Sequence, residues 1–474
     1  MSLDIHTVLD WLPSQRWFGD KGRSVTGVEV VDRGVVDDGP DELVLVIVKV
    51  TFDAGRPSHY GLPLLVDGDG RGRDALEDPR RLGVFGELMA HGNPIKGEHG
   101  VFHFSGPGLD PSRPPGDPVR VMGAEQSNSS LVLDENVILK IFRKVEAGAN
   151  PDLEITRMLT REGFPHIPAQ VGEIFYESYS EEEDEPELQM DLGIAQRFVR
   201  DGTEGWTFTL QQLNSLFDEI HPNDVAEDRP VLIEERASDL LLALDQLGEA
   251  TASLHVVLAR QDLEYDMNAE PVEDTDLADW VDSALDVLAS VEEVPEIAEM
   301  RGAIEHRLQR ATEVTEGGLK IRVHGDYHLG QVLREARTWL LLDFEGEPAR
   351  TLEERRAKQS PLKDVAGMLR SFNYAAHAAL LQRAEPGTDE WSRIEPWARE
   401  WERIAQDRFL AAYLTRSHEG HFLPTERTSL SALLDFFELD KALYEVRYER
   451  GHRPDWIQIP LRGIRQVLER DEDR

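Results

Sequence analysis

The 474-residue sequence contains no cysteine. This absence excludes disulfide bonds, thiolate catalysis and cysteine-ligated metals, so oxygen or histidine atoms must hold any bound metal ion. No apolar run reaches the roughly 18 residues that a membrane-spanning helix needs. The first residues also lack the basic and then apolar regions of a signal peptide. We therefore expect a cytoplasmic protein without a membrane segment.

Positive charge is also scarce. Lys and Arg number 51 against 91 Asp and Glu, which gives a formal net charge of −40. Such a chain repels nucleic-acid backbones and anionic lipids, so neither nucleic acid nor a membrane is an expected partner. A solvated acidic surface accounts for most of the excess. An anionic nucleotide would need locally placed cations and a metal ion. The composition carries no signal of oligomeric state.

The chain divides at a stretch rich in glycine and proline between residues 106 and 118. Residues 1–110 form an expected first unit, in which Leu43–Val50 is typical of a buried strand. Residues 119–199 form a second unit, and residues 200–474 form a third, mainly helical one. Strands come first and helices follow, which predicts an α+β fold with more than one hydrophobic core.

The second and third units have readable elements. Alternating patterns predict a hairpin formed by Ser130–Val132 and Val137–Phe142, and two further strands at Val171–Tyr179 and Leu192–Val199. A periodic pattern predicts a short helix at Pro151–Thr160. The acidic run at 181–187 repels itself and is expected to be an exposed loop. Apolar residues then recur at the helical period across 240–258, Leu277–Leu288, Ile304–Val314 and from Leu362 onward.

Two acidic residues carry the most informative pattern. Asp326 lies at the start of a polar loop, and Asp343 ends an apolar stretch 17 residues later (343 − 326). A hairpin between them would turn both carboxylates toward one cleft. Phosphoryl transfer needs such a pair, because one carboxylate accepts the proton of the acceptor hydroxyl and the other holds Mg²⁺ across the nucleotide phosphates.

The runs His324-Gly325-Asp326-Tyr327-His328, Gln331 and Asp343-Phe344 resemble the aminoglycoside phosphotransferase and choline kinase superfamily. The resemblance implies a bilobal, protein-kinase-like fold that uses ATP and Mg²⁺. It implies that Asp326 is the catalytic base and that Asp343 is the principal metal ligand. Gln331 stands where the superfamily usually has Asn, and its amide oxygen is the expected second metal contact. His328 either orders the loop or contacts the acceptor.

The same resemblance implies a nucleotide site in the second unit. Small polar residues are expected to cover the phosphates, namely Gln126, Ser127, Asn128, Ser129 and Ser130. Lys140 is expected to contact the α- and β-phosphates and to pair with Glu154 on the next helix. The alternative is an edge-strand lysine whose stem packs while its charge reaches water. Gln196 to Val199, with Phe198, form the expected hinge that receives adenine.

Within the superfamily the chain looks most like the actinobacterial maltokinases over nearly its whole length. The shared motifs are Trp11 to Gly19, Glu125 to Ser130, Leu139 to Arg143, His324 to Leu333, Asp343 to Pro348 and Asp364 to Phe372. This resemblance implies transfer of the γ-phosphate of ATP to the anomeric hydroxyl of maltose, giving maltose 1-phosphate for α-glucan synthesis. Gln at the position of Gln331 is usual there. Trp11, Arg16 and Trp17 are interpreted as packing residues of an N-terminal cap rather than as a ligand site.

Near the C-terminus, Lys441, Tyr444, Glu445 and Tyr448 share one helical face. Aromatic surface mixed with polar groups suits sugar recognition, whereas a surface helix with a Lys441–Glu445 charge pair explains the pattern without a ligand. Glucosamine is the second expected acceptor, because similar enzymes use amino sugars. A non-catalytic scaffold is opposed by intact Lys140, Asp326 and Asp343. A metal-dependent hydrolase is opposed by the absence of a His-Glu-x-x-His motif.

Overall fold

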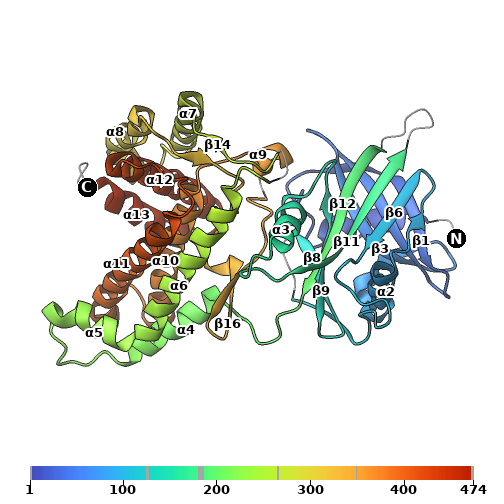
Figure 1. Ribbon diagram of the computed structural model, residues 1–474, viewed down its shortest axis with the longest axis horizontal. Coiled ribbons are helices and arrows are strands. Elements are labelled where there is room, and N and C mark those ends of the chain that lie inside the picture. Colours follow the sequence, from blue (N-terminus) through green and yellow to red (C-terminus); the bar gives the residue numbers. More distant parts are fainter. Residues whose placement is uncertain (1–2, 124–126, 180–185, 264–265, 349, 471–474) are drawn as a thin grey trace. The chain divides into compact units, whose positions relative to one another are not determined.

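The computed structural model describes residues 3–123, 127–179, 186–263, 266–348 and 350–470 (Figure 1). The chain divides into two compact units, one comprising residues 1–200 with 348–352 and the other residues 201–347 with 353–474. The first unit is rich in strands and the second consists mainly of helices. The predicted α+β class, with a β-rich N-terminal part and a helical C-terminal part, is therefore confirmed.

Two antiparallel sheets build the first unit. The five-stranded sheet has the order β1-β2-β3-β10, with β4 paired to β3, and the seven-stranded sheet has the order β5-β6-β11-β12-β9-β8-β7. Strands of the first sheet are β1 (Val25–Asp37), β2 (Glu42–Phe52), β3 (Ser58–Val66), β4 (Gly72–Asp74) and β10 (Lys144–Val145). Strands of the second are β5 (Ile95–Lys96), β6 (Gly100–Ser105), β7 (Val119–Val121), β8 (Asn128–Leu133), β9 (Val137–Phe142), β11 (Gln170–Tyr179) and β12 (Pro186–Arg197). The helices of this unit are α1 (Ile5–Leu9), α2 (Val84–His91) and α3 (Pro151–Arg161).

Strand β2 confirms the predicted buried strand and shows why the run is apolar throughout. Leu43, Leu45 and Ile47 pack into a core with residues of the seven-stranded sheet. The alternating Val44, Val46 and Val48 pack into a second core with Trp17 and Phe18. Because successive side chains of a strand point to opposite faces, an unbroken apolar run is required when both faces are covered.

Strands from both sides of residue 110 share sheets. β6 pairs with β11, so residues 100–105 belong to the sheet that contains Lys140. Conversely, β10 follows the Lys140 strand in sequence but pairs with β3. The predicted separation at residue 110 is thus not a separation of sheets, since pairing crosses it in both directions.

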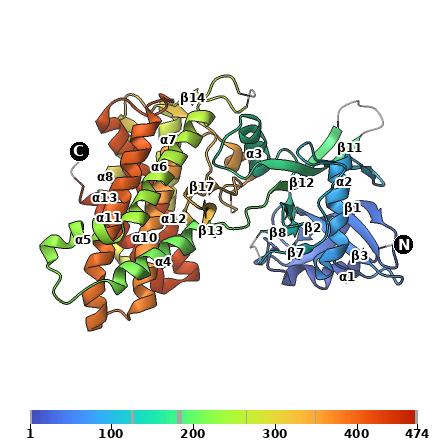
Figure 2. The same cartoon turned by 60° about the horizontal axis from the view of Figure 1, so that its bottom comes forward.

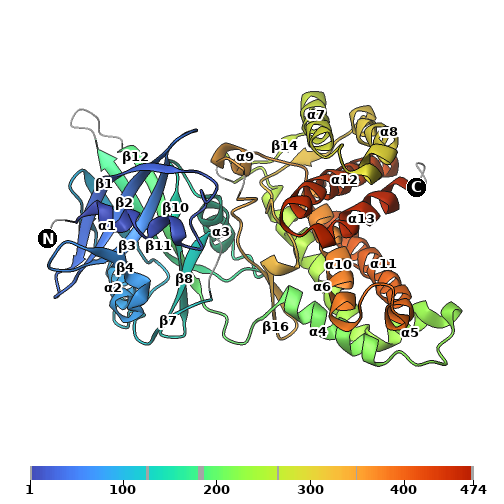
Figure 3. The ribbon, with the colours of Figure 1, turned by 180° about the vertical axis from the view of Figure 1, so that it is seen from behind.

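The second unit is a helical assembly in which α6 lies along α11, and α10 packs against both α11 and α12 (Figure 2). Helix α13 lies beside α12, as the view from behind shows (Figure 3). Its helices are α4 (Gly205–Asp218), α5 (Arg229–Arg236), α6 (Ser238–Leu258), α7 (Asp274–Ser290), α8 (Pro295–Gln309), α10 (Leu362–Arg383), α11 (Asp389–Ser417), α12 (Arg427–His452) and α13 (Gln458–Leu468). Helix α9 (Leu352–Arg356) begins at the last residue assigned to the first unit. Within the described ranges, no helix has the length and apolarity to cross a bilayer.

Short strands of the second unit position the polar loop found in the sequence. β16 (Val332–Glu335) and β17 (Thr338–Leu341) form a hairpin, and β13 (Thr203–Glu204) pairs with β16. β14 (Glu270–Pro271) pairs with β15 (Leu319–Lys320) just before the loop. This hairpin lies between Asp326 and Asp343, where one was predicted.

Candidate active site

The loop that contains Asp326 is fixed by a buried carboxylate, Asp364, in the first turn of α10. The backbone N–H groups of His324 and Gly325 donate hydrogen bonds to Asp364 at 2.8 and 2.9 Å, and Nε2 of His255 lies 3.2 Å from it. Burial alone raises the pKa of Asp364, but the hydrogen bond and charge of His255 outweigh burial and leave the pKa below its ordinary value. The ionised carboxylate therefore holds the loop by two backbone donors.

Two glycines let this loop fold so closely against α10. Gly325 has a φ of +84°, a conformation in which a Cβ atom is strained. At Gly367 of α10, a Cβ atom would lie 2.6 Å from the carbonyl oxygen of Tyr327. The Tyr327 hydroxyl reaches Thr251 of α6 at 2.8 Å. The loop is thus clamped between α10 and α6, which preorganises Asp326.

Asp326 lies beside a lysine from α12. Lys441 Nζ is 3.3 Å from Asp326 Oδ1 and 2.8 Å from Glu347 Oε1. Burial raises the pKa of Asp326, but the charges of Lys441, His328 and His324 outweigh it, so the pKa lies below its ordinary value. A quarter of the Asp326 side chain remains exposed. An ionised, accessible carboxylate on a fixed loop is what a general base requires.

His328 orders the loop. Its Nδ1 accepts a hydrogen bond from the Gly330 N–H at 3.0 Å and caps the short 3₁₀ turn Leu329–Gln331. Nε2 must then carry the proton of the neutral ring, and it lies 3.9 Å from Asp326 Oδ2. Burial lowers the pKa of His328 even though Asp326 opposes this. The loop-ordering interpretation is confirmed, and a contact with the acceptor stays a prediction.

The β16–β17 hairpin brings the two predicted metal ligands together. Gln331 Nε2 donates a hydrogen bond to Asp343 Oδ2 at 3.2 Å, and the Leu342 N–H donates to the Gln331 backbone carbonyl at 2.9 Å. Asp343 has a φ of +65°, which is uncommon outside glycine and is concentrated at functional sites. His324 Nε2 donates to the Leu342 carbonyl at 2.8 Å and so connects this strand end to the loop that contains Asp326. A carboxylate and an amide oxygen are ligands that fit Mg²⁺.

Lys140 lies in the first unit, on an interior strand. β9 stands between β12 and β8 in the sheet, so the edge-strand interpretation is wrong. The lysine side chain is 13% exposed, and its Nζ contacts Asp152 Oδ2 at 3.0 Å. Asp152 lies in the first turn of α3, the predicted helix. The predicted pairing with Glu154, two residues further along α3, stays a prediction.

The predicted phosphate-covering segment enters the sheet earlier than expected. β8 begins at Asn128, so Asn128 and Ser129 belong to the strand rather than to a loop before it. Both are buried, as is Ser130. The Asn128 amide donates to Ser127 Oγ at 3.1 Å. Gln126 lies outside the described residues, and its contribution stays a prediction.

Ser129 is joined to the N-terminal region by a buried arginine. Arg143 donates from Nε to Ser129 Oγ at 2.8 Å and contacts Asp74 at 2.9 Å. Its guanidinium lies 4.4 Å from the ring centre of Trp17. A cavity of about 320 Å³ is bordered by this arginine, Gln15–Trp17 and Asn128–Ser130. Trp17 is therefore a packing residue, as predicted, and it packs against the arginine that holds the predicted phosphate-covering strand.

The predicted hinge lies directly before the second unit begins at Asp201. Gln196 Nε2 donates to the Pro168 carbonyl at 3.1 Å, and the Phe198 N–H donates to the Asn136 carbonyl at 2.8 Å. The position in the chain suits a hinge, whereas adenine binding there stays a prediction.

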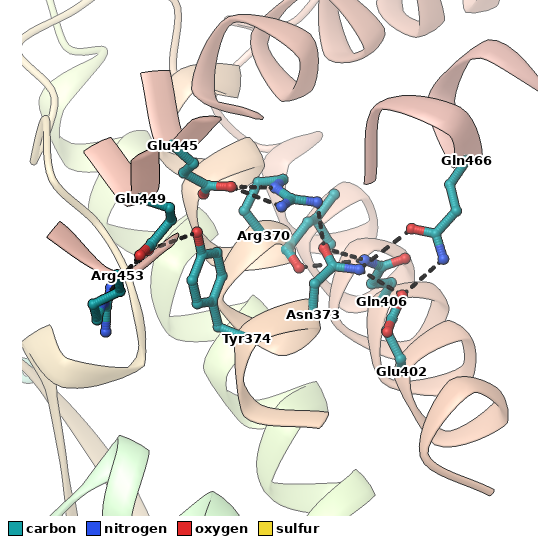
Figure 4. Close-up of polar contacts among 10 residues, drawn as sticks. Arg370, Asn373, Tyr374, Glu402, Gln406, Glu445, Glu449, Arg453 and Gln466 are labelled. Carbon is teal, nitrogen blue, oxygen red and sulfur yellow. Dashed lines mark hydrogen bonds and ion pairs between the residues drawn. The ribbon is translucent and has the colours of Figure 1, made fainter. Parts of the chain in front are cut away.

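The predicted acceptor face lies on α12, but its members have different surroundings. Lys441 lies 5.1 Å from the ring centre of Tyr444 and contacts Asp326, as described above. Glu445 is directed toward Arg370 and is bound by it at 2.7 and 3.0 Å (Figure 4). Tyr448 is 40% exposed and stacks on His452, with ring centres 4.3 Å apart. A surface helix with a Lys441–Glu445 pair does not describe this element, since most of α12 is buried and each of the two charges has its own partner.

Three charged residues, Asp364, Glu347 and Arg370, have structural roles that were not predicted from the sequence. Asp364 and Glu347 lie within motifs that carry the resemblance, yet the motifs do not indicate that one holds the loop and the other shares Lys441 with Asp326. Arg370 lies 75 residues from Glu445. Asp364 and Arg370 stand among the apolar residues of the α10 segment. Because charged residues are rarely buried without a partner, their positions in the sequence indicated that each would have a specific structural role.

Comparisons with known proteins agree with this arrangement. The family model of the maltokinase N-terminal cap domain matches residues 11–84. Glucosamine kinase of Mycolicibacterium smegmatis is 25% identical over 366 residues, which cover 74% of this chain and 79% of that protein. Glucosamine kinase of Streptacidiphilus jiangxiensis is 26% identical over 360 residues, covering 73% and 72%.

Solved structures share the fold. A glucosamine kinase in complex with glucosamine, ADP and inorganic phosphate has a TM-score of 0.68 at 20% identity, over 96% of each chain. A second crystal form of glucosamine kinase has a TM-score of 0.70, over 97% of each chain. Fold, loop and relatives together define a phosphotransferase that acts on an alcohol group. The chain is similar in sequence to glucosamine kinases, and its N-terminal region matches the maltokinase cap domain.

Proposed function

We propose that this kinase transfers the γ-phosphate of ATP to the anomeric hydroxyl of maltose, giving maltose 1-phosphate and ADP. The observation that carries the proposal is the ionised Asp326 carboxylate on its clamped loop, beside Lys441 and Tyr444. The cap domain match supports maltose as the acceptor. Expected partners are therefore ATP, Mg²⁺ and a small neutral sugar.

Each residue has a chemical role in the proposal. Asp326 accepts the proton of the anomeric hydroxyl while that oxygen bonds to the γ-phosphorus and the bridging oxygen leaves with ADP. Asp343 and Gln331 would hold Mg²⁺, which neutralises phosphate charge when it is bound. Lys140, kept in place by Asp152, contributes a cation for the α- and β-phosphates.

Phosphorylation can be tested by measuring ADP release with maltose, glucose, glucosamine, choline and an aminoglycoside in the presence of Mg²⁺. We expect maltose to give the highest kcat/KM. Transfer to the anomeric oxygen destroys the reducing end, so reducing sugar should disappear in step with ADP release. ADP release with the reducing end retained would contradict the proposed position of transfer.

Glucosamine is the second candidate acceptor, because both named relatives are glucosamine kinases. A higher kcat/KM for glucosamine than for maltose would favour it while keeping the kinase assignment.

The role of α12 in acceptor binding has its own test. Removing the Tyr444 side chain, which lies next to Lys441, should raise the KM for maltose about 10-fold or more and leave the KM for ATP nearly unchanged. The exposed Tyr448→Ala variant measures how far the sugar surface extends along the helix. If Tyr444→Ala lowers the melting temperature without changing the maltose KM, α12 has only a structural role.

A further inference from the structure

The carboxylates on the next turns of α12 are already matched by arginines. Glu445 accepts two hydrogen bonds from Arg370, whose side chain is only 2% exposed. Glu449 accepts from Arg453 at 2.7 and 2.9 Å, and a hydroxyl donor, Tyr374, reaches it at 3.1 Å (Figure 4). A carboxylate that is paired in this way is poorly available to an ammonium group of a substrate.

Arg370 cannot easily release Glu445, because its guanidinium is enclosed. The Asn373 side chain accepts from Nη1 at 3.0 Å (Figure 4). Gly463 of α13 also lies against the guanidinium, since a Cβ atom there would lie 1.7 Å from the same nitrogen. The glycine therefore leaves the space that the guanidinium fills. Glu445 is held away from a role as the counter-ion of an amino sugar.

The surroundings of Asp326, the proposed base, are different. Here the positive charge of Lys441 is directed at the carboxylate that is proposed to accept the proton. Lys441 donates to both Asp326 and Glu347. Burial lowers its pKa, but the two carboxylates outweigh burial and hold the pKa above its ordinary value, so the amine stays protonated. The side chain is only 23% exposed, which limits screening by water.

We infer that Lys441 is a specificity-determining residue that excludes acceptors with a positive charge on the sugar ring next to Asp326. The inference rests on the proposed function and concerns the same site. An ammonium within reach of Asp326 would lie close to Lys441, and like charges at such a separation repel strongly where water is partly excluded. Lys441 would have to leave Asp326 and Glu347 before a cationic ring could bind. A neutral sugar hydroxyl meets no such barrier and can hydrogen-bond with both charges.

The test compares glucose with glucosamine, which differ only in the group at C2, and adds maltose as the proposed acceptor. We expect Lys441→Gln to lower the glucose-to-glucosamine ratio of kcat/KM about 10-fold or more. Lys441→Arg keeps the charge and should keep the ratio, even where turnover falls. Arg450→Gln is the matched control, because it also removes one positive charge from α12. Arg450 is exposed and pairs with Glu293. This substitution should change the ratio by less than about 2-fold.

If Lys441→Gln is inactive, dissociation constants of both sugars are measured by calorimetry on the full-length variant and its parent. An unchanged ratio in either measurement overturns the inference, as does an equal change in Arg450→Gln. A parent enzyme that phosphorylates no sugar contradicts the proposed function instead, and the binding ratio still decides the role of Lys441. A parent that prefers glucosamine to glucose contradicts both the proposed acceptor and the exclusion of cationic sugars by Lys441, and it leaves the kinase assignment intact.

Discussion

Two lysines illustrate how the two units use charge differently. Lys140 is held by Asp152, 12 residues later, and the two belong to consecutive elements of the first unit. Lys441 is held by Asp326, 115 residues earlier, and by Glu347. The first pair keeps a cation in place where we expect the phosphates of the nucleotide. The second places the cation on Asp326, the carboxylate predicted to be the base. A buried lysine therefore indicates a candidate functional site, and its role there depends on which carboxylate it pairs with.

Of the residues compared, we expect a substitution of Asp326, the proposed base, to lower turnover the most. Asp326→Asn keeps the shape of the side chain but cannot accept a proton, so we expect kcat to fall about 10²- to 10⁴-fold. ADP release at saturating ATP and sugar measures the loss, and circular dichroism checks the fold. Turnover within a few-fold of the parent would show that Asp326 is not the base and that Lys441 is not directed at a catalytic group.

We expect the next largest effect, a change in Mg²⁺ dependence, from substitutions of the predicted metal ligands. Asp343→Ala removes the carboxylate next to Gln331 and should raise the half-saturating Mg²⁺ concentration about 10- to 100-fold. Mg²⁺ titration at fixed ATP measures this change. Gln331→Ala should give a smaller shift of the same sign. An unchanged Mg²⁺ dependence in Asp343→Ala would place the ion elsewhere.

A substitution of Lys140 should change the kinetic constants for ATP and leave those for the sugar acceptor nearly unchanged. Lys140→Met removes a charged donor and should lower kcat/KM for ATP about 10- to 100-fold. The KM for the sugar should stay within about 2-fold, in contrast to a change at Tyr444. Lys144→Met is the control, because Lys144 is 41% exposed and pairs with Asp20 in the same unit. Equal increases in both KM values would mean that the two lysines do not serve separate ligands.

The smallest expected effect concerns the pH dependence of the first unit. Asp191 of β12 accepts from the Asn150 N–H at 2.7 Å at the start of α3, and burial raises its pKa to about 6. The folded state therefore binds a proton more tightly than the unfolded state, whose carboxyl has a pKa of about 3.9. Stability contributed by this group is present below about pH 4 and is lost as the pH rises through about 6.

Asp191→Asn should remove that loss, because an amide can accept the same hydrogen bond without a charge. The stability of the variant relative to the parent should increase between pH 4 and 7, by at most about 3 kcal/mol. Thermal melts at matched ionic strength measure the difference. A relative stability that does not change with pH would show that Asp191 is not the titrating group.

Local features were predictable from the sequence because their partners are near in the chain. The β8–β9 and β16–β17 hairpins and helix α3 follow from alternation, turn residues and a proline in the first helical turn. These elements bring Gln331 next to Asp343. Lys140 also lies beside the first turn of α3, where its Nζ contacts Asp152 at 3.0 Å, and its pairing with Glu154 stays a prediction.

Features that depend on distant residues were not predictable. β10 joins the sheet of β3, about 80 residues earlier in the chain, and no property of Lys144 or Val145 indicates that choice. The acceptor face of α12 was expected to act as one surface, because helical spacing places its residues together. Its neighbours divide it, since Arg370 binds Glu445 while Asp326 and Glu347 bind Lys441.

The sequence by itself determined the class of fold and the kind of enzyme, and it singled out Asp326 as the predicted base, because these depend on spacing within short segments. Only the tertiary structure decided what each charged group faces. Asp364 holds the loop, Glu445 is matched by Arg370, and Lys441 lies on Asp326. The reason is physical. An ion pair is set by a few ångströms of separation and by the exclusion of water, and packing of segments far apart in the chain controls both.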